Sequence, residues 1–280
     1  MAKAMRMVKE NIRLIDVIIE VVDARAPQSC RNPAFETFFS NKARVIILNK
    51  DDLADREYTR RWVAWYNQKG ISASAMNSRT GSMAKDAARL IERAAAPVLA
   101  RYENKGVHKT LRAMIMGIPN VGKSTFINSM SGTGSLVTGA KPGVTRGLQW
   151  VRITPYLELM DTPGLLWPKL DDPSVARKIA YLGTINDEIL DTEELASMFL
   201  QDMSVLAPDK LVARYGVDID EKTGYELLES VCRARKYLLS GGIPDTERGA
   251  KMVLDEFRNG KMGRISLEAP EGNDAKADGQ

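Results

Sequence analysis

Residues 117–124 read G-I-P-N-V-G-K-S, and no other stretch of this chain constrains its fold as strongly. The spacing G-x-x-x-x-G-K-S is that of a glycine-rich loop whose backbone N–H groups surround phosphate oxygens. The apolar run 113–116 before the loop has the length of a buried strand, and 125–130 after it indicate a helix. A strand, a phosphate-binding loop and a helix in this order predict an α/β sheet with a nucleotide site at its edge.

The loop carries the residue types that a nucleoside triphosphate and its Mg²⁺ require. We expect Lys123 to reach the β- and γ-phosphates and the Ser124 hydroxyl to ligate Mg²⁺. Val121, Gly122 and Thr125 complete the predicted phosphate site at the start of the helix. The alternative interpretation, a chance turn before a helix, is disfavoured by the strand and the helix on either side.

The composition is that of an ordinary globular protein. Of the 280 residues, 44% are hydrophobic and 27% are charged, which suffices for an α/β core and a smaller unit. The longest apolar runs are of strand length, so we expect no membrane span, and the N-terminus lacks a secretory signal pattern, which favours a cytoplasmic location. The two cysteines lack metal-ligand spacing and are predicted to be free thiols. A net charge of +4 permits nucleic-acid binding without requiring it.

Two apolar strands with polar motifs at their ends are predicted before the phosphate-binding loop. Residues 1–14 indicate a helix with a basic face, and 16–23 a buried strand that ends in D-A-R-A-P. A short helix at 32–42 and a second buried strand at 43–48 lead to the quartet N-K-D-D at 49–52. Open α/β sheets bind ligands at the carboxyl ends of their strands, so we expect the quartet near the phosphate site.

The quartet is suited to the recognition of guanine. The carboxylate of Asp52 can accept hydrogen bonds from the N1–H and the exocyclic amino group, while the Asn49 side chain can meet the N7 edge. Adenine has an acceptor at N1, which would leave that carboxylate without a hydrogen bond. The stem of Lys50 is expected to lie along the plane of the base. Together with the phosphate-binding loop, the quartet predicts a guanine nucleotide site.

A third strand of small residues, 71–76, leads into the polar turn 77–81. In this turn Asn77 and Ser78 are candidates for the guanine site, where the Ser78 backbone N–H would meet the guanine O6. The Ser-Ala pair at 74–75 matches the usual guanine-side Ser-Ala motif equally well in residue type, but it would lie inside the strand. Which of the two segments forms the turn therefore stays open.

A long polar loop and a second acidic motif follow the phosphate-binding loop. The Gly-, Ser- and Thr-rich segment 131–147 predicts a mobile loop, in which Thr145 is a candidate second Mg²⁺ ligand that also senses the γ-phosphate. Strands at 148–153 and 156–160 are expected to form a hairpin that ends in D-T-P-G. In this motif Asp161 would hold Mg²⁺ through water, and the Gly164 backbone N–H would meet the γ-phosphate.

The remaining chain predicts a helical domain. We expect helices at 174–182, 192–202, 206–214, 222–235 and 245–258 and no strong strand. The expected domains are therefore 1–172, 173–268 and a disordered tail, 269–280. Basic clusters at 233–236 and 258–264 fit RNA phosphates and solvated helix faces equally well. The aromatic residues of a helix at 55–68 favour core packing over stacking on RNA bases.

The order of the motifs is unusual. In an ordinary small GTPase the guanine motifs follow the phosphate-binding loop, whereas here they precede it, which predicts a circular permutation. Such a permutation preserves the site, because the loops lie on one edge of a single sheet and only their convergence in space matters. A helix from 83 to about 100 and a basic linker would join the former termini. The expected fold is a circularly permuted P-loop GTPase domain, three-layered with a mostly parallel sheet, before an all-helical domain.

These motifs, with P-G-V-T at 142–145 and F-R-N-G-K-M-G-R at 257–264, resemble the circularly permuted GTPases of the YlqF/RbgA ribosome biogenesis family. The resemblance implies hydrolysis of GTP to GDP and phosphate, with Mg²⁺, coupled to assembly of the large ribosomal subunit precursor. Its partners would be rRNA, contacted by the C-terminal helices, and ribosomal proteins, but neither DNA nor a membrane. The family also favours Asn77 and Ser78 for the guanine-side turn.

Three further expectations come from the resemblance. Asn120 matches an asparagine that helps to hold an activating K⁺ beside the phosphates. Leu165 follows D-T-P-G where Ras-like enzymes carry a water-orienting glutamine, so we expect slow intrinsic hydrolysis that the ribosomal particle accelerates. The expected catalytic residues are Lys123, Thr145 and Gly164. The family's proposed catalytic histidine lies in an F-P-G-H-M segment, and the sequence given starts at that methionine, which leaves the histidine open.

Two alternatives to a GTPase assembly factor are a non-catalytic scaffold and a metabolic kinase. A non-catalytic rRNA-binding scaffold could use bound GTP only as a structural switch, and measurements of turnover with and without large-subunit particles would separate it from an enzyme. A P-loop metabolic kinase is disfavoured, because the quartet specifies guanine and no set of residues for an acceptor substrate is evident.

Overall fold

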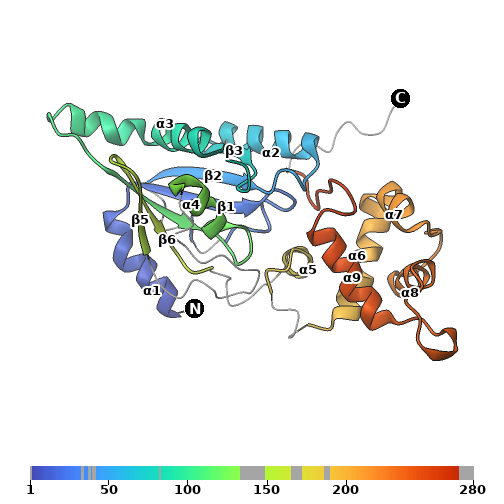
Figure 1. Cartoon of the computed structure of the whole chain (residues 1–280). Coiled ribbons are helices and arrows are strands. Elements are labelled where there is room, and N and C mark those ends of the chain that lie inside the picture. Colours follow the sequence, from blue (N-terminus) through green and yellow to red (C-terminus); the bar gives the residue numbers. More distant parts are fainter. Residues whose placement is uncertain are drawn as a thin grey trace, which may run out of the picture. The chain divides into compact units, whose positions relative to one another are not determined.

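The computed structural model describes residues 2–32, 35–36, 39, 42–81, 83–132, 149–164, 172–185 and 190–270 (Figure 1). The chain divides into two compact units. The first comprises Met1–Asp171 and Glu268–Gln280, and the second comprises Asp172–Leu267. Glu268 thus belongs to the first unit, although the sequence placed it with the helices. The predicted tail lies outside the described residues from 271 onward.

The first unit is built on one sheet, and its α/β class is confirmed. Within the described residues six strands pair in the order β3-β2-β1-β4-β6-β5. All neighbouring strands are parallel except the edge pair β5 and β6, which forms the predicted hairpin. The strands are β1 (Val17–Asp23), β2 (Ala43–Asn49), β3 (Ser72–Met76), β4 (Leu111–Met116), β5 (Gln149–Thr154) and β6 (Leu157–Asp161).

Helices cover both faces of this sheet, as Figure 1 shows. On one face lies α1 (Ala2–Asn11), continued by the 3₁₀ turn η1 (Ile12–Leu14); its Val8 joins a buried cluster with Ile18 of β1 and Met114 of β4. On the other face α3 (Met83–Glu103) packs against α4 (Lys123–Ser131), which follows the phosphate-binding loop. The three-layer arrangement predicted from the motifs is therefore present.

The helix α2 (Arg56–Gln68) packs on β3, and its aromatic residues serve the core. Asp55 caps its first turn by accepting hydrogen bonds from the backbone N–H groups of Glu57 and Tyr58. Trp62 and Tyr66 are buried and their rings stack, with centroids 5.6 Å apart. The preference for core packing over RNA stacking is confirmed for these two residues.

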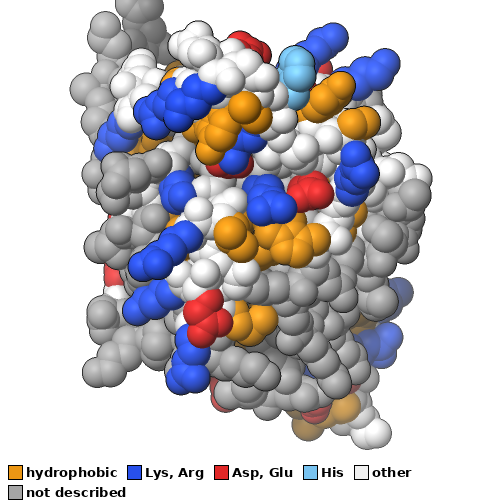
Figure 2. Space-filling model, turned by 90° about the vertical axis from the view of Figure 1, so that its left-hand side faces the viewer, with side chains coloured by type: hydrophobic (Ala, Val, Ile, Leu, Met, Phe, Trp, Pro, Cys, Tyr) orange, Lys and Arg blue, Asp and Glu red, His pale blue; other side chains and the backbone are white. Residues whose placement is uncertain are grey.

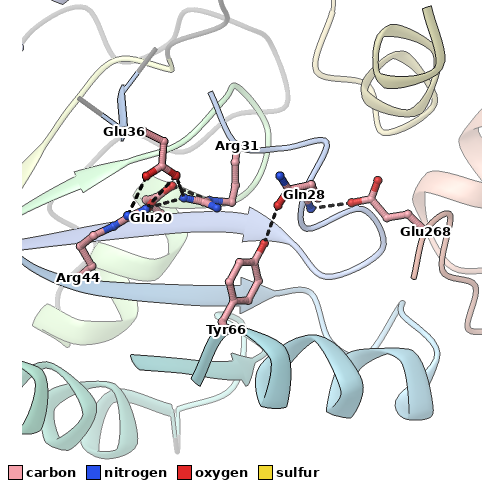
Figure 3. A network of polar contacts seen from close by, with 7 residues as sticks. All are labelled: Glu20, Gln28, Arg31, Glu36, Arg44, Tyr66 and Glu268. Atoms are coloured by element: carbon pink, nitrogen blue, oxygen red, sulfur yellow. Dashed lines mark hydrogen bonds and ion pairs between the residues drawn. The ribbon is translucent and has the colours of Figure 1, made fainter. Parts of the chain in front are cut away.

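A buried carboxylate on β1 is neutralised by arginines, as Figure 3 shows. Glu20 pairs with Arg31 (Nε–Oε2 3.0 Å) and with Arg44 of β2 (NH2–Oε1 2.7 Å), and both arginines also pair with Glu36. A buried charge is tolerated only when it is paired, so this network holds the segment after β1 against the sheet. The helix predicted at 32–42 lies largely outside the described residues.

The chain returns to the first unit at Glu268. Its carboxylate accepts a hydrogen bond from the backbone N–H group of Gln28 (2.6 Å; Figure 3). The same carboxylate accepts from the Ser29 N–H (3.0 Å), and the Glu268 carbonyl oxygen accepts from Trp62 Nε1 (3.1 Å). The chain end that follows the helical unit is thereby bonded to the loop after β1.

The second unit is helical, and the predicted helices are found with ends that differ by a few residues. The rings of Tyr181, Phe199 and Phe257 meet in its core, with centroid distances of 5.2 and 4.8 Å. None of the described helices is both long and apolar enough to cross a membrane. The helices are α5 (Pro173–Tyr181), α6 (Thr192–Leu206), α7 (Pro208–Tyr215), α8 (Gly224–Ala234) and α9 (Thr246–Arg258).

Candidate functional site

The polar motifs of the first unit meet at one edge of the sheet. β1, β2, β3, β4 and β6 run parallel, so their carboxyl ends lie along the same edge. The register places Asp23 beside Asn49, Asn49 beside Met76, and Ile115 beside Asp161. The loops that follow these strands carry residues 23–27, 49–52, 77–81, 117–124 and 161–164.

Close packing requires glycine at two places in the phosphate-binding loop. A Cβ on Gly117 would lie 2.3 Å from the carbonyl oxygen of Val21, and a Cβ on Gly122 would lie 2.3 Å from Nδ2 of Asn49. Gly122 also has a left-handed backbone (φ +96°) and caps α4. Asn120 adopts the left-handed region as well (φ +63°), which asparagine tolerates better than most residues. The loop thus turns tightly into the N-terminus of α4, where N–H groups favour an anion.

Asn49 joins the phosphate-binding loop to the turn after β3. Its Nδ2 donates to the carbonyl oxygen of Val121 (2.7 Å), and its Oδ1 accepts from the backbone N–H (3.0 Å) and the hydroxyl (2.7 Å) of Ser78. The hydroxyl of Ser129 on α4 donates to the Ser78 carbonyl oxygen from the other side. In this structure the Ser78 N–H therefore bonds Asn49, and its predicted donation to guanine O6 stays a prediction.

Lys50 is held by the motif that follows β1. Its Nζ lies 2.9 Å from Oδ2 of Asp23, and Arg25 binds the same carboxylate through Nε and NH2, each at 2.9 Å. Burial alone raises the pKa of Asp23, but the charges and hydrogen bonds of Arg25 and Lys50 outweigh it and hold the pKa well below its usual range. Sequence reasoning missed this role of Asp23, although its D-A-R-A-P motif had marked the place.

Asp52 and Asn77 line one cavity of about 430 Å³. Ligand-binding pockets of proteins commonly span roughly 300–1,000 Å³, so this cavity has room for a purine. Asp52 is exposed, and its carboxylate is available to a base that offers two donors. The cavity is lined by Asp51, Asp52, Ser74, Ala75, Met76, Asn77, Thr80, Met83 and Asp86.

Lys123 is buried inside the phosphate-binding loop. Its Nζ donates to the carbonyl oxygen of Ile118 (2.9 Å). Burial lowers the pKa of Lys123 to about 8, although the negative charge of Asp161 acts in the opposite direction. The side chain therefore sits where a phosphate anion would restore the charge that burial disfavours.

The oxygen atoms of Ser124 and Asp161 fit a Mg²⁺ site. Ser124 Oγ donates to Asp161 Oδ2 across 3.4 Å, and Asp161 is fully buried at the end of β6. Mg²⁺ binds hard oxygen ligands at about 2.0–2.1 Å and usually keeps several waters and phosphate oxygens. The described residues contain no group of three or more His, Cys, Asp or Glu placed to hold a metal. The other predicted ligand, Thr145, lies outside the described residues, as does Leu165.

The D-T-P-G turn touches the phosphate-binding loop. A Cβ on Gly164 would lie 2.9 Å from Cα, Cγ and N of Pro119, so a larger residue would push the two loops apart. The hydroxyl of Thr162 donates to the carbonyl oxygen of Ile115 (2.7 Å) at the end of β4. Gly164 is thus next to the loop whose phosphate it is predicted to sense, and Thr125 lies partly buried in the first turn of α4.

Part of the chain matches a known family of GTPases. Residues 112–221 match a family described as "50S ribosome-binding GTPase". The match begins inside β4, so the quartet 49–52 precedes it. Two solved YlqF structures match nearly the whole chain, and the permuted order of the motifs is thereby confirmed.

Several curated proteins named ribosome biogenesis GTPase A are similar to nearly the whole chain. The protein from Bacillus cereus is 39% identical over 272 residues, which cover 97% of this chain and 92% of that protein. The one from Priestia megaterium is 40% identical, covering 96% and 94%. The one from Thermotoga maritima is 32% identical, covering 96% and 92%.

Solved structures agree with the sequence matches. A structure described as GNP-bound YlqF from T. maritima has a TM-score of 0.67 and 28% identity, covering 96% of this chain and 99% of that one. A structure described as GDP-bound TM YlqF also has a TM-score of 0.67, with 27% identity and coverage of 94% and 99%.

Proposed function

The chain belongs to the ribosome biogenesis GTPase A family, and from that premise we propose that it is a GTP-hydrolysing assembly factor for the large ribosomal subunit. As a member of this family it binds GTP and hydrolyses it to GDP and phosphate. The observation that carries the proposal is the convergence of Asn49, Asp52, Lys123, Ser124 and Asp161 on one edge of the sheet.

The phosphate-binding loop and α4 are proposed to bind the triphosphate. The Lys123 ammonium would exchange the Ile118 carbonyl oxygen for β- and γ-phosphate oxygens, and the N–H groups at the start of α4 would point at the same anion. Ser124, Asp161 and Thr145 would hold Mg²⁺, Asp161 through water. When bound, Mg²⁺ supplies positive charge at the phosphate oxygens that gain negative charge during transfer.

Asp52 is proposed to recognise the guanine base. Two donors of guanine, the N1–H and the amino group, can both bond its carboxylate, and Asn77 lines the same cavity. Asn49 contributes by holding the turn 77–81 to the phosphate-binding loop. The ammonium group of Lys50 is held by its ion pair with Asp23. The buried pairs therefore position the loops before the nucleotide arrives, which reduces the entropy lost on binding.

A potassium ion is proposed as a second cation. The support is the family resemblance at Asn120, together with the left-handed backbone that turns this residue within the phosphate-binding loop. Without a glutamine after D-T-P-G, hydrolysis is proposed to be slow until the particle is bound. Turnover in KCl and in NaCl tests this part: equal rates in the two salts would exclude K⁺ activation.

The helical unit is proposed to bind rRNA, and the structure narrows the residues available. Arg258 donates to the carbonyl oxygens of Ala180 and Tyr181, and Arg235 donates to the Arg214 carbonyl oxygen, so both are used inside the unit. Arg233 and Lys236 remain exposed. These two are the better candidates for phosphate contacts in that cluster.

Co-sedimentation with purified large ribosomal subunits tests the proposal. We expect the chain to pellet with the particles in the presence of a non-hydrolysable GTP analogue and to stay in the supernatant with GDP. Small subunits serve as the control. Equal pelleting with both nucleotides, or none with either, would contradict a GTP-dependent assembly factor.

A further inference from the structure

The edge of the sheet opposite to the nucleotide loops, where the parallel strands begin, is also tied together by hydrogen bonds. Asp16, at the start of β1, accepts from the Arg112 backbone N–H (3.0 Å) and pairs with Lys109 Nζ (3.0 Å). The backbone N–H of Leu111 donates to the Tyr156 carbonyl oxygen (2.8 Å) in the turn between β5 and β6. The start of β1, the linker before β4 and this turn are therefore held together at this edge.

That surface is basic. Figure 2 shows Lys and Arg side chains spread over this side of the first unit, with few acidic side chains among them. Arg6, Arg13 and Arg152 are exposed, and none of the three is within ion-pair distance of a carboxylate among the described residues, although Glu158 lies opposite Arg152 on the neighbouring strand. The acidic residues at its centre, Asp16 and Glu158, are already paired, Glu158 with Arg112 Nε at 3.3 Å. The excess positive charge therefore faces solvent.

Aromatic rings lie among these charges. Trp150 on β5 is 42% exposed, and the Arg112 guanidinium lies 5.5 Å from its ring centroid. Arg152 on β5 and Arg112 on β4 both lie beside Glu158 of β6. Trp150 lies two residues before Arg152 on β5, so its side chain is on the same face of the sheet. Tyr156 in the adjoining turn is 66% exposed. β5 is an edge strand, so the ring of Trp150 is accessible from the side of the sheet.

We propose that this strand-start surface (Arg6, Arg13, Lys105, Arg112, Trp150 and Arg152) binds RNA, with phosphates on the arginines and an unpaired base stacked on Trp150. Proteins that bind single-stranded RNA combine a basic track with exposed aromatic rings, because every base has a face that can stack. The inference rests on the proposed function and deepens it, since it names RNA as the component of the ribosomal particle that the nucleotide-binding unit itself contacts.

Charge and position favour RNA over a protein partner. Arginines without carboxylate partners create a positive potential that suits a polyanion, and the exposed rings are separated by charges instead of forming one apolar patch. Because β5 is antiparallel to β6, Trp150 lies beside Met160, one residue from Asp161, so the surface runs from the strand starts along β5 toward the nucleotide loops.

The test measures binding of a fluorescein-labelled RNA hairpin with about ten unpaired adenosines in its loop, by anisotropy over a range of KCl concentrations. Trp150→Ala is expected to weaken binding about tenfold, the effect of losing one stacked base. The triple variant Arg6→Ala, Arg13→Ala, Arg152→Ala is expected to reduce the slope of log affinity against log salt by about 2, since each single-strand phosphate contact contributes about 0.7. The control replaces three exposed residues of α3, Lys85, Arg89 and Arg93, by Ala and should bind like the parent chain.

Binding of a fluorescent GDP analogue is measured on the same samples. If both variants bind the hairpin with the parent affinity and salt slope while GDP binding is intact, the RNA inference is overturned and the proposed function stands. If the variants keep hairpin binding but lose binding to ribosomal proteins freed of RNA, the surface docks protein and the inference is also overturned. Failure of the parent chain to bind the GDP analogue would refute the proposed function instead.

Discussion

The two edges of the central sheet differ in their charged and polar side chains, which are buried and paired at one edge and exposed at the other. At the carboxyl edge Asp23, Asn49, Lys123 and Asp161 are all less than 10% exposed, and each is held by a partner within the unit. At the strand-start edge Arg6, Arg13 and Arg152 extend into solvent. A compact ligand of fixed shape needs pre-positioned groups, whereas a long polyanion is bound by many exposed charges. The difference indicates a specific nucleotide site on one side and a salt-sensitive surface on the other.

Removal of the loop lysine should have the largest effect. Lys123→Ala is expected to weaken GTP binding about a thousandfold, because charge-assisted hydrogen bonds to two phosphates are lost in a buried site. The melting temperature should not fall, since burial of the ammonium is unfavourable in the empty protein. Titration of a fluorescent GTP analogue and a thermal melt measure both, with Lys85→Ala on α3 as the control. A melting temperature that drops with the affinity would show that Lys123 supports the fold.

The second largest effect is expected on the selectivity of the site for guanine. Asp52→Asn is expected to weaken GTP binding about a hundredfold, because two hydrogen bonds from guanine to a carboxylate are lost. The amide can instead donate to the O2 carbonyl of xanthine, so XTP should bind the variant better than GTP does. Asp51→Asn is a matched control, since Asp51 lines the same cavity one residue earlier. Unchanged preference for guanine in Asp52→Asn would place the base elsewhere.

Asn49→Ala should affect both binding and folding. The change leaves the Val121 carbonyl oxygen and the Ser78 N–H without their buried partner, which costs about 2–3 kcal/mol of unfolding free energy. Urea denaturation measures that loss. Asn259→Ala at the end of α9 is the comparison, because its exposed amide bonds only Asp255, one turn earlier. If stability were unchanged while GTP binding fell, Asn49 would contact the base alone and would not join the two loops.

The pH dependence of binding is the smallest effect. With a pKa of about 8 in the empty protein, Lys123 is protonated below pH 8, and a bound triphosphate raises that pKa. Binding therefore takes up a proton above pH 8, and GTP affinity should fall about tenfold from pH 7 to pH 9. Between pH 8 and the unfolded value of 10.5, the unfolded chain holds more protons, so the empty protein gains stability as pH rises.

Calorimetry in buffers of different ionisation enthalpy measures the proton uptake directly. The Lys123→Ala variant is the control, because titration of the guanine base itself affects both proteins equally. A parent chain with the same pH profile as the variant would show that Lys123 keeps its charge throughout.

Local patterns predicted most of the elements. β1, β2 and β4 are continuous apolar runs bounded by polar turns, and α2 begins where Asp55 can cap it, so each could be placed from its own residues. The boundary at Glu268 could not, because its position depends on hydrogen bonds to Gln28, 240 residues away.

The sequence by itself determined the family and the fold class of this protein, and the spacing of four short motifs predicts the phosphate loop, the guanine reader, the acidic metal ligand and their permuted order. Each motif is local, so its residues need only a strand and a turn to act. Only the tertiary structure decided which residues support one another. The bond from Asn49 to Val121, the pairing of Lys50 with Asp23, and the bond from the Arg112 N–H to Asp16 all depend on strand register and packing. Those contacts form between distant parts of the chain, where no local pattern specifies the partner.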